Sequence, residues 1–360
     1  MSRRLLVILF FLVCNSGLAV PATYYVSTGG DDGAAGSIEA PFLTPAFAMS
    51  QMLAGDTMYI KADGDYATED GANDCILLVD ISVGTVRTII EGYTTTPGDG
   101  GVVTFDGGPA SCSYGILFSA TSIQYYAFRN IEVENAAVQG FRCNGNDYVV
   151  FINCSATITA GYAFVADTYC VFERCNGGIE TGGYSTLYGC TAVDCALDVF
   201  VVGASSLIFG CVIDGIANGK GGIYSAGDFV SVVNCTIDGH DVTTNYGIYL
   251  AGIRINLYNN IVRDCTNGIY SLATNVDKRY SDYNCVYSCG TAYFYWLYGA
   301  HSITGDPKHT SAGTGVYTLE SDSPCINTGV GGSDMGGVGY VAVGGGGGGV
   351  VQLVGGGLVQ

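Results

Sequence analysis

The chain has 360 residues, of which 12% are charged and 55 are glycine. A formal net charge of −19 opposes binding to nucleic acid or to anionic membrane surfaces. Low charge together with abundant Gly, Val, Ile, Tyr and Asn favours strands and tight turns over long surface helices.

The N-terminal segment 1–22 has the pattern of a secretory signal peptide. Arg3 and Arg4 precede an apolar run over 5–13, which is too short to cross a bilayer, and cleavage is expected after Ala19 or Ala22. The mature chain then has 11 basic and 32 acidic residues, a net charge of −21. We expect a secreted protein, extracellular or at the cell surface, with no nucleic-acid partner and no membrane insertion.

Internal repetition is the strongest signal in the sequence. Similar four-residue segments end at an anchor position and recur at 128–131, 151–154, 172–175, 187–190, 208–211, 232–235, 257–260 and 282–285. The anchors are 23, 21, 15, 21, 24, 25 and 25 residues apart. A second element, typified by Gly-Ile-Tyr at 222–224, 247–249 and 268–270, follows many of the anchors.

Each period holds two or three short β-rich runs that are too short to form a core alone. Stacking one period on the next buries their aliphatic side chains in a continuous column. The sequence therefore predicts an all-β fold, a single-stranded right-handed parallel β-helix, over 23–340. The step of 15 residues allows a perimeter of only about 50 Å, which is short for three faces and favours a slip of the register there.

Both ends of the predicted solenoid differ from its middle. Thr44 and Pro45 favour the start of a short capping helix that runs to Leu53, with Phe42, Met49 and Leu53 covering the open core. This N-terminal cap spans about 23–70, and a closing segment spans about 300–340. The Gly-rich residues 341–360 have no core-forming pattern and are interpreted as a tail or linker.

Asparagine and cysteine recur at fixed places in the repeat. Asparagine precedes the anchor at 130, 153, 234, 259 and 284, where it suits a left-handed bend with stacked side-chain amides. Cysteine is assigned to the anchor at 154, 175, 190, 211, 235 and 285, which favours a column of inward-facing thiols over disulfides. Cys265 and Cys289 are one period apart outside that column and are the best disulfide candidates.

Several terminal motifs resemble those of the secreted pectate-lyase-like right-handed parallel β-helix superfamily. They are Tyr24-Tyr25-Val26-Ser27, Gly30-Asp31-Asp32, Ala40-Pro41-Phe42, Gly55-Asp56-Thr57-Met58-Tyr59-Ile60, Asp306-Pro307, Ser323-Pro324-Cys325-Ile326-Asn327 and Asp334-Met335-Gly336. The resemblance implies the fold across about 23–340. Because the superfamily includes lyases, hydrolases, epimerases and adhesins, it does not select an activity.

Candidate catalytic residues lie on turns that follow successive anchor strands. They are Asp214, Lys220, His240, Asp241 and Arg263. Stacked coils would bring these turns together, with Lys220 or His240 as a base, Arg263 offsetting substrate charge, and an aspartate holding a cation or a proton. The alternative is that they are ordinary polar turn residues.

The sequence specifies no cofactor or metal ligand set. Ca²⁺ is the cation that the acidic turns would suit, although their spacing fits no EF-hand loop, which favours solvated turns. Exposed tyrosines would suit an extracellular polysaccharide or cell-surface glycan as the partner. The sequence does not determine the oligomeric state.

Two classes of function remain open. The favoured one is a non-catalytic carbohydrate-binding, adhesin-like or surface structural protein, because a recognisable catalytic motif is lacking. The alternative is a polysaccharide lyase or glycoside hydrolase acting on an extracellular polysaccharide. A basic cleft bordered by carboxylates would favour the enzyme, and a flat acidic surface would favour binding.

Overall fold

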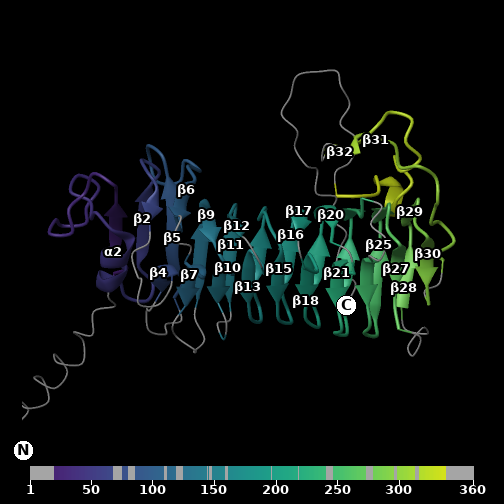
Figure 1. The fold of residues 1–360 in the computed structure, drawn as a ribbon, viewed down its shortest axis with the longest axis horizontal. Helices are drawn as coiled ribbons and strands as arrows, with labels where there is room; N and C mark the ends of the chain where they lie inside the picture. The colour runs from purple at the N-terminus through teal and green to yellow at the C-terminus, as the bar shows by residue number, and fades with distance from the viewer. Residues whose placement is uncertain are drawn as a thin grey trace, which may run out of the picture.

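The computed structural model describes residues 20–67, 75–79, 86–108, 112–118, 125–143, 145, 148–158, 161–195, 197–217, 219–240, 246–272, 279–295, 298–312 and 316–337. Strands stack along one long axis, with the N-terminal cap at one end and a folded-back C-terminal segment at the other (Figure 1). The predicted parallel β-helix is confirmed. Asp241, the segment 341–360 and nearly all of the predicted signal peptide lie outside the described residues.

Three faces run the length of the solenoid. Sheet A contains β1 (Thr23–Val26), β2 (Thr57–Lys61), β5 (Thr88–Tyr93), β8 (Tyr126–Arg129), β11 (Val149–Ile152), β14 (Val171–Glu173), β16 (Thr186–Tyr188), β19 (Leu207–Phe209), β22 (Ser231–Val233), β25 (Ile255–Tyr258) and β28 (Arg279–Asp282). Sheet C contains β4 (Cys75–Val79), β7 (Tyr114–Phe118), β10 (Gln139–Cys143), β13 (Phe164–Ala166), β15 (Ile179–Thr181), β18 (Phe200–Val202), β21 (Gly221–Ser225), β24 (Tyr246–Leu250), β27 (Asn267–Tyr270) and β30 (Thr291–Phe294).

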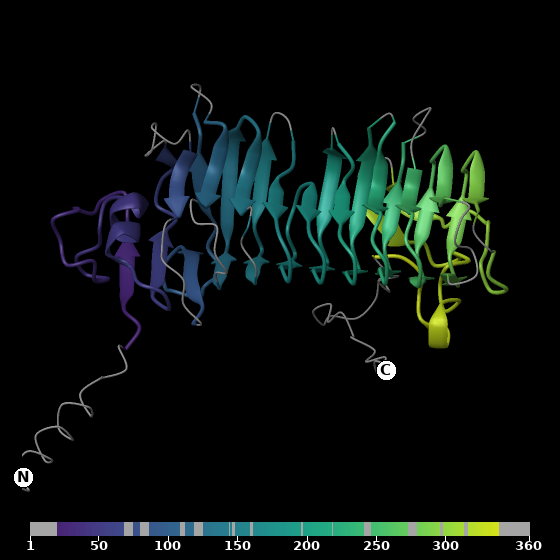
Figure 2. The same ribbon diagram turned by 90° about the horizontal axis from the view of Figure 1, so that it is seen from below.

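The third face, sheet B, is in two parts. One part is β3 (Tyr66–Ala67), β6 (Val103–Asp106), β9 (Ile131–Ala136) and β12 (Ser155–Ile158), and the other is β17 (Thr191–Cys195), β20 (Val212–Ile216), β23 (Thr236–Asp238), β26 (Ile261–Arg263) and β29 (Cys285–Tyr287). The ordinary coil thus gives one strand to each sheet, and Figure 2 shows the stack from a second side.

The 15-residue step is a genuine short coil. Phe172 of β14 pairs with Leu187 of β16, so the register does not slip. This coil shortens its sheet B side to Asn176, which forms only isolated bridges to Ser155 and Thr191. Reducing one face to a single residue explains how the smaller perimeter still closes.

The interior is filled by columns of like side chains. Phe128, Phe151 and Phe172 are fully buried and stack at ring distances of 5.5 and 5.1 Å. On sheet C, Phe141 and Phe164 stack at 4.8 Å. Parallel in-register pairing places equivalent residues directly above each other, so the repeat in the sequence becomes a continuous apolar core.

The anchor column is interior, as predicted, but its last member was misassigned. Cys154, Cys175, Cys190, Cys211 and Cys235 are each at most 1% exposed. The pairing of Ile261 with Cys285 puts Cys285 one residue beyond the anchor. Asn260 and Asn284 occupy the anchor position instead, because the last step is 24 residues rather than 25.

The asparagines before the anchor form the predicted bends at four of five places. Asn130, Asn153, Asn234 and Asn259 have φ between 53° and 58°, and Asn153 Nδ2 donates to Asn130 Oδ1 at 2.9 Å. The prediction is wrong for Asn284, which is fully buried. Tyr283 takes the bend there, with φ of 55°.

The capping helix α2 (Pro45–Gln51) begins as predicted. The Thr44 hydroxyl accepts a hydrogen bond from the Phe47 N–H at 3.2 Å, and Phe42 and Met49 are buried. The predicted burial of Leu53 is wrong. The helix ends at Gln51, Met52 takes the buried place, and Leu53 is 68% exposed.

The segment after the last coil folds back along the solenoid. It contains an antiparallel hairpin of β31 (His309–Ser311) and β32 (Val316–Leu319) and the 3₁₀ turn η3 (Val330–Gly332) (Figure 1). Leu319, Cys325 and Met335 pack on Ile261 and Cys285 in a small second core. The N–H of Gly337 donates to Thr236 Oγ1 at 3.0 Å, so the segment spans several coils.

Candidate functional site

The predicted catalytic residues Asp214 and Arg263 occupy one outward row of sheet B. Asp214 pairs in register with Asp238, and Asp238 pairs with Arg263. His240 follows β23, and its Nε2 lies 2.5 Å from Asp214 Oδ1. The structure therefore brings Asp214, His240 and Arg263 to one side of the solenoid.

Arg263 is engaged by two carboxylates. Its Nε lies 3.3 Å from Asp238 Oδ2 and 2.6 Å from Asp264 Oδ2. The Asp238 side chain is only 4% exposed, and burial raises the pKa of this carboxyl above its ordinary value. Arg263 therefore already neutralises protein carboxylates, which leaves it less able to offset the charge of a substrate.

The folded-back segment covers this row. The Tyr317 hydroxyl donates to Asp214 Oδ1 at 2.5 Å, and Tyr317 is 2% exposed. Its ring meets His309 edge-on, with centroids 5.1 Å apart. The row therefore serves as an anchor for the hairpin, and its polar groups are bonded to one another.

Lys220 lies at the same edge of the fold but outside this bonded group. It ends the turn between β20 and β21, with its backbone N–H bonded to the carbonyl of Ala217 and its carbonyl to the N–H of Tyr246. Asp241 falls outside the described residues. A catalytic role for Lys220, His240, Asp241, Arg263 and Asp214 stays a prediction.

Cys265 and Cys289 lie next to each other on neighbouring coils as free thiols. The S–H of Cys265 donates to the carbonyl oxygen of Arg263 at 3.1 Å, and the S–H of Cys289 donates to that of Tyr287 at 3.4 Å. The neighbouring Cys289 thiol and burial raise the pKa of Cys265. Their predicted disulfide stays a prediction. The thirteen cysteines whose side chains the structure describes are all free thiols.

Two of the acidic residues considered for Ca²⁺ bond to the chain itself, whereas Glu69, Asp70 and Asp74 lie outside the described residues. Asp32 accepts hydrogen bonds from Leu43 and Thr44, and Asp63 accepts them from Ser27 and Thr28. Within the part of the chain that the structure describes, no group of three or more His, Cys, Asp or Glu residues is arranged to hold a metal ion.

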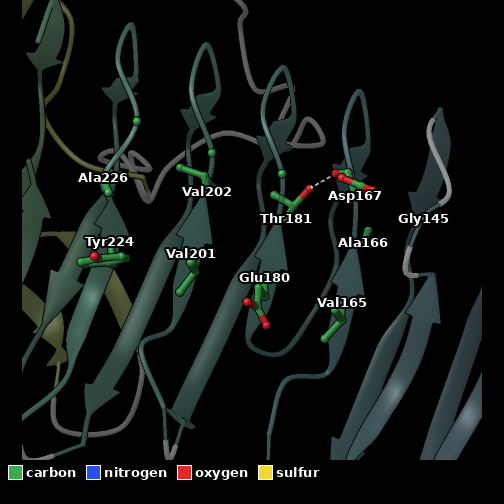
Figure 3. A pocket seen from close by; sticks show the side chains of 13 residues that line it. Gly145, Val165, Ala166, Asp167, Glu180, Thr181, Val201, Val202, Tyr224 and Ala226 are labelled. Atoms are coloured by element: carbon green, nitrogen blue, oxygen red, sulfur yellow. Dashed lines mark hydrogen bonds between the residues drawn. The ribbon is translucent and has the colours of Figure 1, made fainter. Parts of the chain in front are cut away.

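A groove on the outer face of sheet C is the strongest candidate site. It has a volume of about 500 Å³ and runs across β13, β15, β18 and β21. Figure 3 shows Val165, Glu180, Val201 and Tyr224 side by side along its floor. Strand pairing places these four residues in one row, with one residue from each coil.

Two carboxylates belong to the groove. Glu180 is exposed at the centre of the row, and Asp167 lies at the end of β13, where its backbone carbonyl accepts the Thr181 hydroxyl at 2.9 Å (Figure 3). Burial and the charges of Asp198 and Glu180 raise the pKa of the Tyr162 phenol. The short coil sets this geometry, because Glu180 lies on it.

An aromatic row continues the groove along sheet C. Tyr224 pairs with Tyr249, Tyr249 with Tyr270, and Tyr270 with Phe294. The rings of Tyr249 and Tyr270 are 4.9 Å apart, as are those of Tyr270 and Phe294. All four side chains are partly exposed, so the row offers aromatic surface to a ligand along the solenoid axis.

The groove carries negative charge. Its described lining has Asp167 and Glu180 but neither lysine nor arginine. Arg142 precedes Val165 in the same row, but its guanidinium lies over the Tyr114 ring at 4.7 Å, one coil further from the groove. The arrangement suits neutral hydroxyl-rich ligands and disfavours anionic ones.

Comparison of the whole structure agrees with the architecture. The crystal structure of pectate lyase Pel9A matches with a TM-score of 0.57 and 15% identity, over 91% of this chain and 98% of that chain. The chain has the pectate-lyase-like β-helix fold. A rhamnogalacturonan lyase matches with a TM-score of 0.49 and 16% identity over 79% and 87% of the two chains. A GH136 lacto-N-biosidase from Eubacterium ramulus matches with 0.48 and 11% over 84% and 70%.

These structural neighbours are carbohydrate-active proteins, and at such low identity the likeness is one of fold. No protein-family model matches the chain, and no curated protein matches its sequence. Within the described residues, no helix is long and apolar enough to cross a membrane.

The sequence analysis singled out Tyr224 within the Gly-Ile-Tyr element but missed the groove, because Glu180 and Asp167 belong to no motif. Glu180 lies within the shortest step of the repeat, between the anchors Cys175 and Cys190. That step was itself the available signal. A coil reduced on one side is the place where a regular solenoid departs from its repeat, and Glu180 is the one acidic residue in the sheet C row that starts there.

Proposed function

We propose that the protein is a secreted glycoside hydrolase that binds a polysaccharide chain along sheet C. The observation that carries the proposal is the presence of Glu180 and Asp167 in one groove that continues into a row of aromatic side chains. Hydrolysis of a glycosidic bond needs two carboxyl groups, one acting as acid and the other as base or nucleophile.

The composition of the groove favours hydrolysis over a lyase reaction. A lyase that acts on uronates needs a base and a cation or arginine to offset the substrate carboxylate. Neither lysine nor arginine lines the described part of the groove, and Glu180 and Asp167 would repel a uronate. Carboxylates without neighbouring cations are instead suited to acid–base work on a neutral sugar.

Each carboxylate is given a role by its surroundings. Glu180 projects from the middle of β15 between Val165 and Val201, so apolar side chains flank it in the row (Figure 3). Because Glu180 stands at the centre of the row that would carry the glycan, we assign it as the general acid. Asp167, on the turn after β13, is assigned as the second carboxyl group, which activates water or attacks the sugar.

A non-catalytic carbohydrate-binding protein is the second candidate. The row from Tyr224 to Phe294 favours it, because aromatic faces bind sugars without any catalytic group. The two candidates share a binding surface and differ only in what Glu180 and Asp167 do.

The test is a screen of purified protein against neutral and acidic polysaccharides, with binding and new reducing ends measured separately. We expect binding and turnover of a neutral polysaccharide, turnover at least 100-fold lower in Glu180→Gln and Asp167→Asn, and unchanged turnover in Lys220→Ala, on the turn between β20 and β21. Binding without reducing ends would support the second candidate. Turnover that survives in both groove variants would overturn the assignment, and unsaturated ends would show a lyase instead.

A further inference from the structure

An aromatic column occupies the outer corner of the solenoid where each coil enters sheet A. Tyr125, Tyr148, Tyr169 and Tyr184 stack face to face, with successive ring centroids 4.8, 4.9 and 4.8 Å apart. Their interplanar angles are 15°, 11° and 12°. The spacing matches the distance between neighbouring strands, so each coil supplies one ring.

The backbone shows that the corner position continues beyond Tyr184. The φ angles are 58° at Tyr184, 59° at Ser205, 61° at Phe229 and 56° at Arg254. The N–H groups of Tyr184, Ser205 and Phe229 each donate to the carbonyl just before the next corner, namely Ala204, Asp228 and Ile253. Ser205 is therefore the exact structural equivalent of the tyrosines, with a hydroxymethyl group in place of a ring.

The serine leaves a gap of one ring in the column. Tyr184 and Phe229 lie two coils apart, which corresponds to about 9.6 Å at the strand spacing of parallel sheets. A single ring placed midway would lie about 4.8 Å from each, the distance at which the tyrosines stack on one another. The gap thus has the dimension of one inserted ring.

Both walls of the gap are fixed in place and open to solvent. The ring of Tyr184 is held from behind by Tyr169, and Tyr184 is 57% exposed. Phe229 is 47% exposed, and the Arg254 guanidinium covers its far face at 4.8 Å from the ring centroid. Leu207, two residues after Ser205, is 39% exposed and adds apolar surface beside the gap.

We propose that this gap, the Ser205 notch, is a sugar subsite that holds one pyranose ring between Tyr184 and Phe229. The choice of a sugar rests on the carbohydrate class of the proposed function. Two apolar walls require a pyranose whose faces both carry axial C–H groups, which means equatorial hydroxyls as in gluco- and xylo-configured rings. An axial hydroxyl, as in galacto-configured rings, would meet an aromatic face and lose its hydrogen bonds to water.

The notch is joined to the sheet C groove by the turns between the two sheets. Three glycines on these turns line the groove, namely Gly182, Gly203 and Gly227. The corner residue of the same coil lies two positions after each glycine, at Tyr184, Ser205 and Phe229 respectively. These turns pack so closely that a Cβ on Gly203 would lie 2.4 Å from the backbone nitrogen of Gly183. The turns between the groove and the notch therefore lack side chains at these glycines, so a glycan bound in the groove can extend over them into the notch.

The deciding variant fills the notch. Ser205→Tyr places a tyrosine at this corner. Tyr148, Tyr169 and Tyr184 already occupy the equivalent corners of other coils with similar φ angles, so the variant should fold and keep or raise the melting temperature. We expect it to weaken binding of cellohexaose or xylohexaose at least 10-fold in calorimetry. Ser205→Ala is the matched control, because it leaves the notch open and should bind as the wild type does.

A small probe tests the notch independently of the groove. In saturation-transfer NMR, methyl β-glucoside should receive signal from the wild type and from the groove variant Tyr224→Ala, and not from Ser205→Tyr. Methyl β-galactoside should give a clearly weaker signal. Equal signal from the two sugars would overturn the proposed ring selectivity.

The same variants separate this inference from the proposed function. Unchanged hexasaccharide binding in Ser205→Tyr, with binding lost in Tyr224→Ala, would overturn the notch and leave the groove standing. Binding lost in Ser205→Tyr but not in Tyr224→Ala would support the notch and overturn the groove. Absence of binding to every sugar would overturn both.

Discussion

Tyr317 donates its phenolic hydrogen to Asp214 Oδ1 at 2.5 Å, across 103 positions of the chain. The same carboxylate oxygen lies 2.5 Å from His240 Nε2. Asp214 thus links three parts of the chain. They are its own strand β20, the turn that follows β23 on the next coil, and the folded-back hairpin. The polar row that sequence reasoning assigned to catalysis makes the contacts expected of a docking site for this hairpin.

Removing the Tyr317 hydroxyl should weaken this docking. Tyr317→Phe keeps the ring against His309 but leaves Asp214 with one donor fewer in a covered position, at a cost of about 1–3 kcal/mol. We expect a lower melting temperature and faster amide exchange in β31 and β32. Tyr295→Phe, at a half-exposed ring, is the control and should change neither; equal exchange in both variants would contradict the anchoring role.

The fold was predictable because it rests on repetition that is visible in the letters. One aliphatic or aromatic side chain per coil and a bend residue before the anchor were enough to predict the parallel β-helix. The wrong assignment of Cys285 to the anchor shows what the sequence pattern cannot resolve, namely a change of one residue in coil length. Asn284 and Cys285 reproduce the Asn-Cys pair of earlier coils, and only strand pairing reveals that the coil is one residue shorter.

The candidate site was much less predictable. His240, Asp214 and Arg263 lie on one side of the solenoid because stacked coils bring equivalent positions together, although Asp214 and Arg263 lie in β20 and β26 rather than in turns. That Tyr317 covers them depends on a segment returning from 103 residues away, which no local pattern encodes. Glu180 and Ser205 were missed for a related reason. Each stands out only because it differs from the apolar or aromatic residues at the equivalent position of neighbouring coils.

The hairpin should also make stability depend on pH. Burial and the charge of Arg263 lower the pKa of His309 to about 4, although Asp306 and Asp264 oppose the shift. The unfolded chain binds this proton near pH 6.5 and the folded chain does not, so stability falls as pH drops from 6.5 to 4, by at most about 3 kcal/mol.

Urea unfolding at several pH values measures the effect of His309. We expect His309→Phe to flatten the dependence between pH 4 and 6.5 while retaining the contact with Tyr317. Asp238 acts in the opposite direction, because its raised pKa favours the folded state as pH falls, so the comparison is between variant and wild type rather than with a flat line. A dependence that is identical in both proteins would contradict the role of His309.

The thiol column should be chemically silent in the folded protein. Cys154 is 1% exposed, and burial raises its pKa to about 12, so thiolate is scarce at neutral pH. Ellman's reagent should modify the column thiols only after unfolding, and Cys195, which is partly exposed, should react earlier. Fewer than four free thiols per mature chain under denaturing, non-reducing conditions would refute the unbridged column, and a loss confined to Cys265 and Cys289 would establish their disulfide.

Asn260 gives the sharpest test of the anchor column. Its Nδ2 donates to the carbonyl of Val232 at 2.9 Å, the role that the S–H of Cys235 has toward Ile208 one coil earlier. Its Oδ1 also accepts the N–H of Cys235 at 3.0 Å. Because both partners are fully buried, Asn260→Leu leaves a donor and an acceptor unpaired and should cost at least about 2–4 kcal/mol.

The matched variant Asn260→Cys separates hydrogen bonding from packing. The S–H can still donate to the Val232 carbonyl, as the cysteines do elsewhere in the column, so the bonds to the Cys235 N–H and to Asn284 Oδ1 are the ones lost. We expect denaturant unfolding to place Asn260→Cys between the wild type and Asn260→Leu, roughly 1–2 kcal/mol below the wild type. Equal destabilisation by cysteine and leucine would mean that the hydrogen bond to the Val232 carbonyl contributes nothing to stability. Asn260 and Asn284 would then replace cysteine in the column for a reason other than hydrogen-bond donation.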